Sequence, residues 1–182
     1  MERFDLVVIG AGPSGYAAAM RAIDFKKKTL LIEKSNVGGA GITHGALSSK
    51  TWWELSREAS AFRKNLKRYN IRAPHINYKE IQEEVRKAVQ ERKSMLEEHM
   101  DKLKSSNYSE FLSFKTGTAK LLDKNTIEIM QGAHTEIIWA THIILATGSR
   151  PRYLPELPID EKIVMTSEGI ENMEDFPESM VI

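Results

Sequence analysis

The chain has 182 residues, of which 41% are hydrophobic and 28% are charged, and it contains no cysteine. This length suits one domain or one domain with a fragment of another, and the apolar share excludes wholesale disorder. Lys and Arg number 26 against 25 Asp and Glu, so the net charge of +1 favours neither nucleic acid nor an anionic membrane as a partner. No apolar run approaches the roughly 20 residues of a membrane span, and the lack of thiols excludes disulfides and thiolate–zinc sites. We therefore expect a soluble cytoplasmic protein without a signal peptide.

The start of the chain has the pattern of a βαβ unit. Residues 4–9 form a β-branched apolar run that ends at a glycine, as expected for a strand buried on both faces. Residues 13–25 carry small side chains at helical spacing, which would let a helix lie close to a sheet. A second apolar run at 29–32 ends at Glu33 and is predicted to be the next strand.

A glycine-rich segment and two long amphipathic patterns follow. Four glycines in the nine positions of 37–45 exclude a regular helix or strand there and permit close approach of backbone to a ligand. A helix is predicted from 48 to about 67. Asn77 with Glu80 has the spacing of a helix start, so a second helix is predicted to run to about 103. We interpret its many charges as a solvated face, rather than as a coiled coil or a nucleic-acid surface.

The remaining sequence has the pattern of short strands. Strands are predicted at 110–115, 118–122, 126–130 and 136–140, as in an antiparallel meander inserted into an α/β fold. Residues 141–146 are predicted to return as a buried strand, and the prolines beyond them mark an extended segment. Residues 180–182 resemble the opening of another strand, so we expect the chain to belong to a longer protein.

The strongest motif lies between the first strand and the first helix. Gly10-Ala11-Gly12-Pro13-Ser14-Gly15 matches G-x-G-x-x-G, and Glu33 stands at the end of the next predicted strand, which is the context that a dinucleotide-binding turn requires. Such a turn brings backbone against a pyrophosphate at a helix N-terminus. Glu33 is placed to accept hydrogen bonds from ribose hydroxyls, and an acid at this position argues against a 2′-phosphate.

The turn fits either a nicotinamide dinucleotide or FAD. Two features favour FAD. The glycine-rich segment 37–45 begins where a simple dehydrogenase usually begins a further helix, and the segment Ala146–Ser149 follows a helical and meander insert.

Five anchors at 7–15, 31–34, 38–39, 49–50 and 146–149 make the chain resemble the pyridine nucleotide–disulfide oxidoreductases over nearly its whole length. This family includes dihydrolipoamide dehydrogenase, glutathione reductase and soluble transhydrogenase. The resemblance implies a Rossmann-like FAD-binding domain at 1–150, a connecting segment at 151–182 toward a nicotinamide-binding domain, and a homodimeric full-length protein that uses NAD(P)H.

The resemblance also implies roles for individual residues. Glu33 would hold the adenosine ribose, Lys34 and Ala119 would lie at the adenine, Lys50 would lie near the flavin ring, and residues 147–149 would close over the cofactor. The implied cofactor-binding residues are Gly10, Gly12, Pro13, Ser14, Gly15, Glu33, Lys34, Gly38, Gly39, Ala40, Lys50, Ala119, Ala146, Thr147 and Gly148.

The sequence departs from the family where the redox-active cysteines belong. Gly41 and Ala46 occupy the two cysteine positions, so dithiol–disulfide exchange is excluded and we expect a small-molecule acceptor other than a disulfide. Lys50 and His44 are the candidate catalytic residues. Lys50 would stabilise electron density on the flavin. We interpret His44 as a loop histidine, with proton donation at the flavin as the alternative. The histidines lack metal-ligand spacing, so no metal site is predicted.

Two other functions remain open. The chain could be a nicotinamide-binding dehydrogenase domain, or an inactive flavin-binding homologue kept for interaction or regulation. By itself we expect the 182-residue chain to bind FAD weakly or not at all, and not to turn over.

Overall fold

The structure is a computed structural model that describes residues 1–72 and 75–182 and divides into two compact units. Unit 1 consists of Met1–Gly41 and Arg92–Ser149, and unit 2 of Ile42–Glu91 and Arg150–Ile182. The predicted domain boundary near residue 150 coincides with the end of unit 1, but unit 2 also includes the helical segment before Arg92. The assignment of 1–150 to one functional domain stays a prediction.

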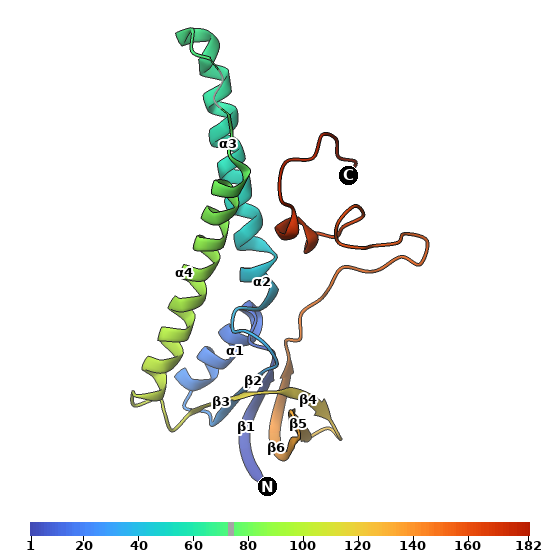
Figure 1. Cartoon of the computed structure of the whole chain (residues 1–182). Coiled ribbons are helices and arrows are strands. Elements are labelled where there is room, and N and C mark those ends of the chain that lie inside the picture. The colour runs from blue at the N-terminus through green and yellow to red at the C-terminus, as the bar shows by residue number, and fades with distance from the viewer. Residues whose placement is uncertain (73–74) are drawn as a thin grey trace. The chain divides into compact units, whose positions relative to one another are not determined.

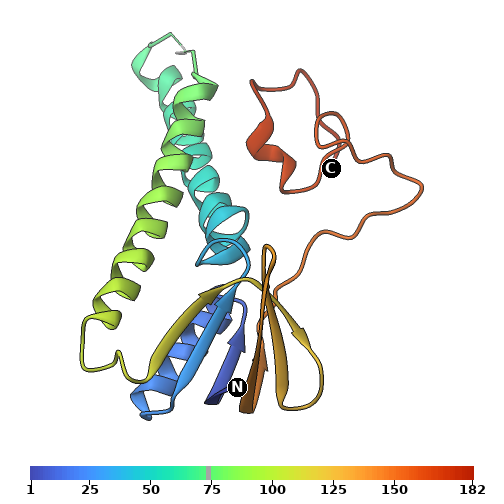
Figure 2. The same cartoon turned by 60° about the horizontal axis from the view of Figure 1, so that its bottom comes forward.

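Unit 1 contains a six-stranded sheet in the order β3-β2-β1-β6-β5-β4 (Figures 1 and 2). Strand β1 pairs in parallel with β2 and with β6, and β2 pairs in parallel with β3. Strands β4, β5 and β6 form an antiparallel meander. The strands are β1 (Glu2–Ile9), β2 (Thr29–Glu33), β3 (Leu112–Thr116), β4 (Thr118–Leu121), β5 (Thr126–Gln131) and β6 (His134–Leu145).

Alternation along the central strands creates two separate cores. Val7 and Ile9 of β1 point to one face and Val8 to the other, since successive side chains of a strand alternate. On the first face the parallel strands meet the meander through Phe4, Val7, Ile9, Leu30, Ile32, Ile127, Ile129, Ile138 and Ala140. On the second face they meet helix α1 (Pro13–Asp24) and the last turns of α4 (Tyr78–Lys104) through Val8, Ala11, Ala19, Ile23, Leu31, Met100, Leu103 and Leu112.

One glycine joins the parallel strands to the meander. Gly117 is the single residue between β3 and β4, and its φ of +157° lies in a region that favours glycine. A Cβ at this position would lie 2.9 Å from Cγ2 of Ile129 and from the carbonyl oxygen of Met130, so there is no room for a side chain. The N–H of Gly117 donates to the carbonyl oxygen of Glu33 over 2.9 Å, which ties this crossing to the end of β2.

Unit 2 is built on helix α3 (Ala46–Tyr69), the first turns of α4 and the segment after Arg150, which carries a short 3-10 helix at Gly169–Asn172. Helix α3 ends at Asn70 in the left-handed conformation, with φ +53°. Helix α4 begins as predicted, because the Asn77 side chain accepts a hydrogen bond from the N–H of Lys79 over 3.1 Å. None of the described helices is both long enough and apolar enough to cross a bilayer.

The predicted fold class, an α/β fold with a parallel sheet and an antiparallel meander, is confirmed, but two strand predictions were wrong. Strand β3 does not belong to the meander. It pairs in parallel with β2, because the long helical segment between these two strands supplies the crossover that a parallel pair needs. The two strands predicted at 136–140 and 141–146 are one strand, β6, which pairs with β5 up to Trp139 and continues beside β1 to Leu145.

Three further expectations differ from the structure. The glycine-rich segment contains a short helix, α2 (Gly39–Thr43), because close packing on the preceding turn overrides the low helix propensity of glycine. The end of β6 is not buried: Leu145 is 61% exposed, since this part of the strand extends past its pairing with β5. Residues 180–182 form no strand.

Candidate functional site

The turn between β1 and α1 is fixed by its own backbone. Gly10 has φ +101°, and a Cβ there would lie 2.3 Å from the carbonyl oxygen of Ala146. A Cβ at Gly15 would lie 1.8 Å from the carbonyl oxygen of Gly10. The N–H of Gly10 donates to the carbonyl oxygen of Ile32 over 2.8 Å, and the N–H of Ala146 donates to the carbonyl oxygen of Ile9 over 2.8 Å. The ends of β1, β2 and β6 therefore hold the turn in one shape.

Gly12 is different, because the space beside it is open. A Cβ on Gly12 would meet no atom within 4 Å, and its φ of −67° is allowed for any residue. Gly12 is the N-cap of α1, Pro13 begins the helix, and no side chain caps it. The first turn therefore offers unpaired N–H groups and the positive end of the helix dipole beside an open space, which suits a phosphate.

Glu33 points toward this turn. Its side chain is 8% exposed, and its Oε2 accepts a hydrogen bond from the N–H of Ala11 over 2.7 Å. Its Oε1 accepts from the N–H of Ser35 over 2.9 Å. The carboxylate is therefore held at the end of β2 by two backbone donors, and each oxygen keeps a lone pair that could accept from a ribose hydroxyl.

The second glycine-rich segment packs on the first turn. The N–H of Gly38 donates to the carbonyl oxygen of Ala11 over 2.8 Å. A Cβ at Gly39 would lie 3.1 Å from Cα of Gly12, and a Cβ at Gly41 would lie 2.6 Å from Cγ of Pro13. The two glycine-rich segments therefore lie against each other in unit 1, although Gly15 and Gly38 are 23 residues apart in the sequence.

The other predicted cofactor residues in unit 1 are mostly accessible. Lys34, Ser14 and Ala40 are exposed, and Ala119 is half-buried on β4. Ala146 and Thr147 follow β6, and Gly148 has φ +72° with open space where a Cβ would be. The structure thus brings the turn, Glu33, residues 38–40 and Ala146 together.

The two candidate catalytic residues belong to unit 2. Lys50 is exposed on α3. Nδ1 of His44 lies 3.5 Å from Oε2 of Glu171, so a carboxylate faces this ring. The catalytic roles of Lys50 and His44 stay predictions. Within residues 1–72 and 75–182, no group of three or more His, Asp or Glu side chains could hold a metal ion.

Sequence reasoning missed several partners of these residues. The N–H groups of Ala11 and Ser35 hold Glu33, but backbone donors carry no signature in a side-chain pattern.

The hydroxyl of Tyr16 on α1 hydrogen-bonds Nδ1 of His99 on α4. Partial burial raises the pKa of Tyr16, and the charge of Arg92 offsets part of this effect.

Comparisons with known proteins show the family of this chain. The profile of the pyridine nucleotide-disulphide oxidoreductase family matches residues 4–180. Dihydrolipoyl dehydrogenase of Chlamydia pneumoniae is 34% identical over all of this chain, and that of Bacillus subtilis is 29% identical over 98% of it. The chain spans 38% of the length of each of these relatives.

Solved structures show the same fold. LpdA from Mycobacterium tuberculosis superposes with a TM-score of 0.80 at 21% identity, covering 98% of this chain and 38% of LpdA. RclA from Escherichia coli, described as a flavoprotein disulfide reductase, gives a TM-score of 0.69 at 19% identity, covering 96% of this chain and 35% of RclA. The family match agrees with a turn that suits a phosphate and with the carboxylate of Glu33 held beside it. This chain is a member of the pyridine nucleotide-disulphide oxidoreductase family.

Proposed function

We propose that this chain is the FAD-binding part of a flavin-dependent NAD(P)H oxidoreductase that works without a redox-active disulfide. The open space at Gly12 is the observation that carries the proposal, because the glycines on either side are packed against backbone and this one is not. The unpaired N–H groups at the start of α1 would bind the pyrophosphate. Glu33 would accept from the adenosine ribose, while residues 38–40 would lie along the pyrophosphate and ribityl chain. FAD, when bound, supplies hydride acceptance from a reduced nicotinamide and electron donation to an acceptor.

The absence of a thiol relay is the second part of the proposal. The chain contains no cysteine, and Gly41 stands at the first cysteine position of the family. A Cβ at Gly41 would lie 2.6 Å from Cγ of Pro13, inside the contact distance of two carbon atoms, so this backbone has no room for a cysteine there. This supports an acceptor that is a small molecule other than a disulfide. The family resemblance further supports a homodimer for the longer protein, and the chain's composition supports a cytoplasmic location.

Titration of the ¹⁵N-labelled chain with FAD tests the nucleotide site, because NMR detects weak binding that would not survive purification. We expect millimolar FAD to shift the amide signals of Gly12, Ser14, Gly15 and Glu33 in a saturable way. The variant Gly12→Ala should keep its other amide signals and lose this response, because its methyl group would occupy the open space. No saturable shift in the 182-residue chain, together with a longer protein that holds no FAD, would refute the site.

The same titration distinguishes the two rival functions. NAD⁺ that binds more tightly than FAD, without shifting Gly38 and Gly39, would indicate a nicotinamide-binding domain instead. For the longer protein, anaerobic addition of NADH or NADPH should bleach the flavin absorbance. A longer protein that holds FAD but is reduced by neither nicotinamide would indicate an inactive homologue.

A further inference from the structure

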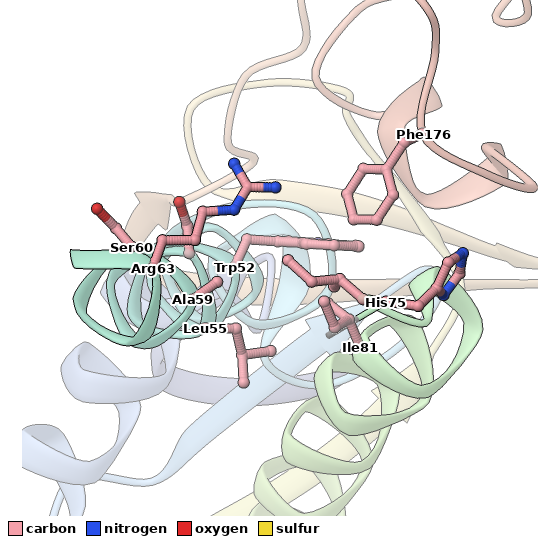
Figure 3. A pocket seen from close by; sticks show the side chains of 10 residues that line it. Trp52, Leu55, Ala59, Ser60, Arg63, His75, Ile81 and Phe176 are labelled. Carbon is pink, nitrogen blue, oxygen red and sulfur yellow. The ribbon is translucent and has the colours of Figure 1, made fainter. Parts of the chain in front are cut away.

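Unit 2 contains a cavity of about 630 Å³ that no role in the proposed function uses (Figure 3). Its volume falls in the range of roughly 300–1,000 Å³ that is typical of small-molecule sites. The side chains that form its apolar wall come from α3, from the start of α4 and from the segment after Arg150. They include Trp52, Leu55, Ile81 and Phe176.

The aromatic part of this wall is held in place by an internal stack. The indole of Trp52 stacks on Tyr78 at 5.7 Å between ring centroids, and Phe176 meets Tyr78 edge-on at 4.9 Å. Tyr78 is 5% exposed, so the middle ring of the three is fixed. Nε2 of the buried Gln82 donates to the carbonyl oxygens of Glu171 and Met173, at 2.8 and 3.1 Å, which anchors the chain just before Phe176. The aromatic wall is therefore preorganised.

The polar part of the cavity contains one permanent charge, the guanidinium of Arg63, beside neutral hydroxyl groups and a histidine. Arg63 of α3 and His75 flank Trp52 in Figure 3. Among the described residues, neither side chain forms a hydrogen bond or an ion pair, and no described lining residue is acidic. Arg57, six residues earlier on α3, is instead paired with Glu54 at 3.2 Å. Arg63 is exposed, so its guanidinium is accessible beside an apolar aromatic wall and has no ion-pair partner among the residues that the structure describes. This combination is the feature that indicates a ligand.

We propose that this cavity binds a planar aromatic carboxylate, with its ring on the wall formed by Trp52 and Phe176 and its carboxylate on Arg63. A guanidinium matches a carboxylate with two parallel hydrogen bonds, and these are stronger than hydrogen bonds between neutral groups. The lining residues belong to unit 2 and the nucleotide turn belongs to unit 1, so the inference rests on other residues than the proposed FAD site does.

Calorimetric titration of the 182-residue chain with naphthalene-2-carboxylate tests the proposal, with naphthalene-2-carboxamide as a neutral probe of the same shape. We expect saturable binding of the carboxylate and binding about tenfold weaker for the carboxamide, which corresponds to one charge-assisted hydrogen-bonded pair. Arg63→Gln should weaken binding of the carboxylate by about tenfold and leave the affinity for the carboxamide unchanged. Phe176→Ala should weaken binding of both probes.

Arg68→Gln is the matched control, because Arg68 is an exposed arginine of the same helix that does not line the cavity. It should change neither affinity by more than about twofold. Absence of saturable carboxylate binding would overturn the proposal. Equal affinities for the two probes would also overturn the proposal and point to a neutral apolar ligand. An equal loss of carboxylate affinity in Arg63→Gln and Arg68→Gln would overturn it as well, because the effect would then be a general attraction between charges. Thermal unfolding of each variant verifies that the fold is intact.

Discussion

Replacing Gly10 by alanine should cost much more stability than replacing Gly12, although the two residues belong to one turn. At Gly10 the new methyl group would lie 2.3 Å from the carbonyl oxygen of Ala146, and the backbone is at φ +101°. Left-handed strain costs about 1–2 kcal/mol and overpacking about 1–3 kcal/mol, so Gly10→Ala should lose about 2–5 kcal/mol of unfolding free energy. At Gly12 the methyl group meets nothing within 4 Å and φ is −67°. Gly12→Ala should therefore change stability by no more than about 1 kcal/mol, because the gain of about 0.4–1 kcal/mol from restricting the unfolded chain is opposed by the weaker N-capping of alanine.

Urea unfolding followed by circular dichroism measures both changes without any ligand. Gly10→Ala should be less stable than Gly12→Ala by about 1–6 kcal/mol, which corresponds to roughly 2–24 °C in melting temperature for a chain of this size. A matched loss of stability in Gly10→Ala and Gly12→Ala would refute the reasoning, because it would mean that the space at Gly12 is filled by protein. Unchanged stability in Gly10→Ala would refute the close contact with Ala146.

Three further predictions concern other parts of the chain. Glu33→Gln should lose about 1–3 kcal/mol in the same urea assay, because an amide NH₂ cannot accept a hydrogen bond and one of the two backbone donors would lose its partner. Tyr78→Phe should keep the unfolding free energy or raise it by up to about 1 kcal/mol, since the buried hydroxyl has no hydrogen-bond partner among the described residues. A clear loss of stability in this variant would mean that the hydroxyl does have a partner. Desolvation lowers the pKa of Lys115, but the hydrogen bond and charge of Glu136 and the charge of Glu2 outweigh it and hold that pKa above 10.5. The folded chain therefore keeps this proton more tightly than the unfolded chain. The contribution of Lys115 to stability should be complete below pH 10.5 and fall as the pH rises through the folded pKa, and urea unfolding from pH 8 to 11 should show a smaller decline in Lys115→Met.

Local patterns in the sequence predicted the elements that depend on local chemistry. The apolar run before Gly10 and the spacing of Asn77 and Glu80 correctly predicted β1 and the start of α4. The G-x-G-x-x-G motif placed the turn between a strand and a helix, and the structure has it there. In each case the signal and the structure that it specifies lie within a few residues of each other.

Pairing between distant segments could not be predicted in the same way. Strand β3 resembles its meander neighbours in composition, and only its parallel pairing with β2 distinguishes it. Nothing between Ala140 and Thr141 specifies whether one strand or two are present, because the answer depends on the continuous partner β1. At the site, the motif predicted which glycines matter, but only coordinates distinguish Gly10 and Gly15, which pack against backbone, from Gly12, which faces open space.

The contact between Gly10 and Gly15 has a genetic consequence. A damaging substitution in a protein core can often be rescued by shrinking a neighbouring side chain. Here the atom that a new Cβ at Gly15 would strike, at 1.8 Å, is the carbonyl oxygen of Gly10, and no codon change removes a carbonyl. A selection for second-site suppressors of Gly15→Ala should therefore recover true revertants and no compensating substitution elsewhere in the turn.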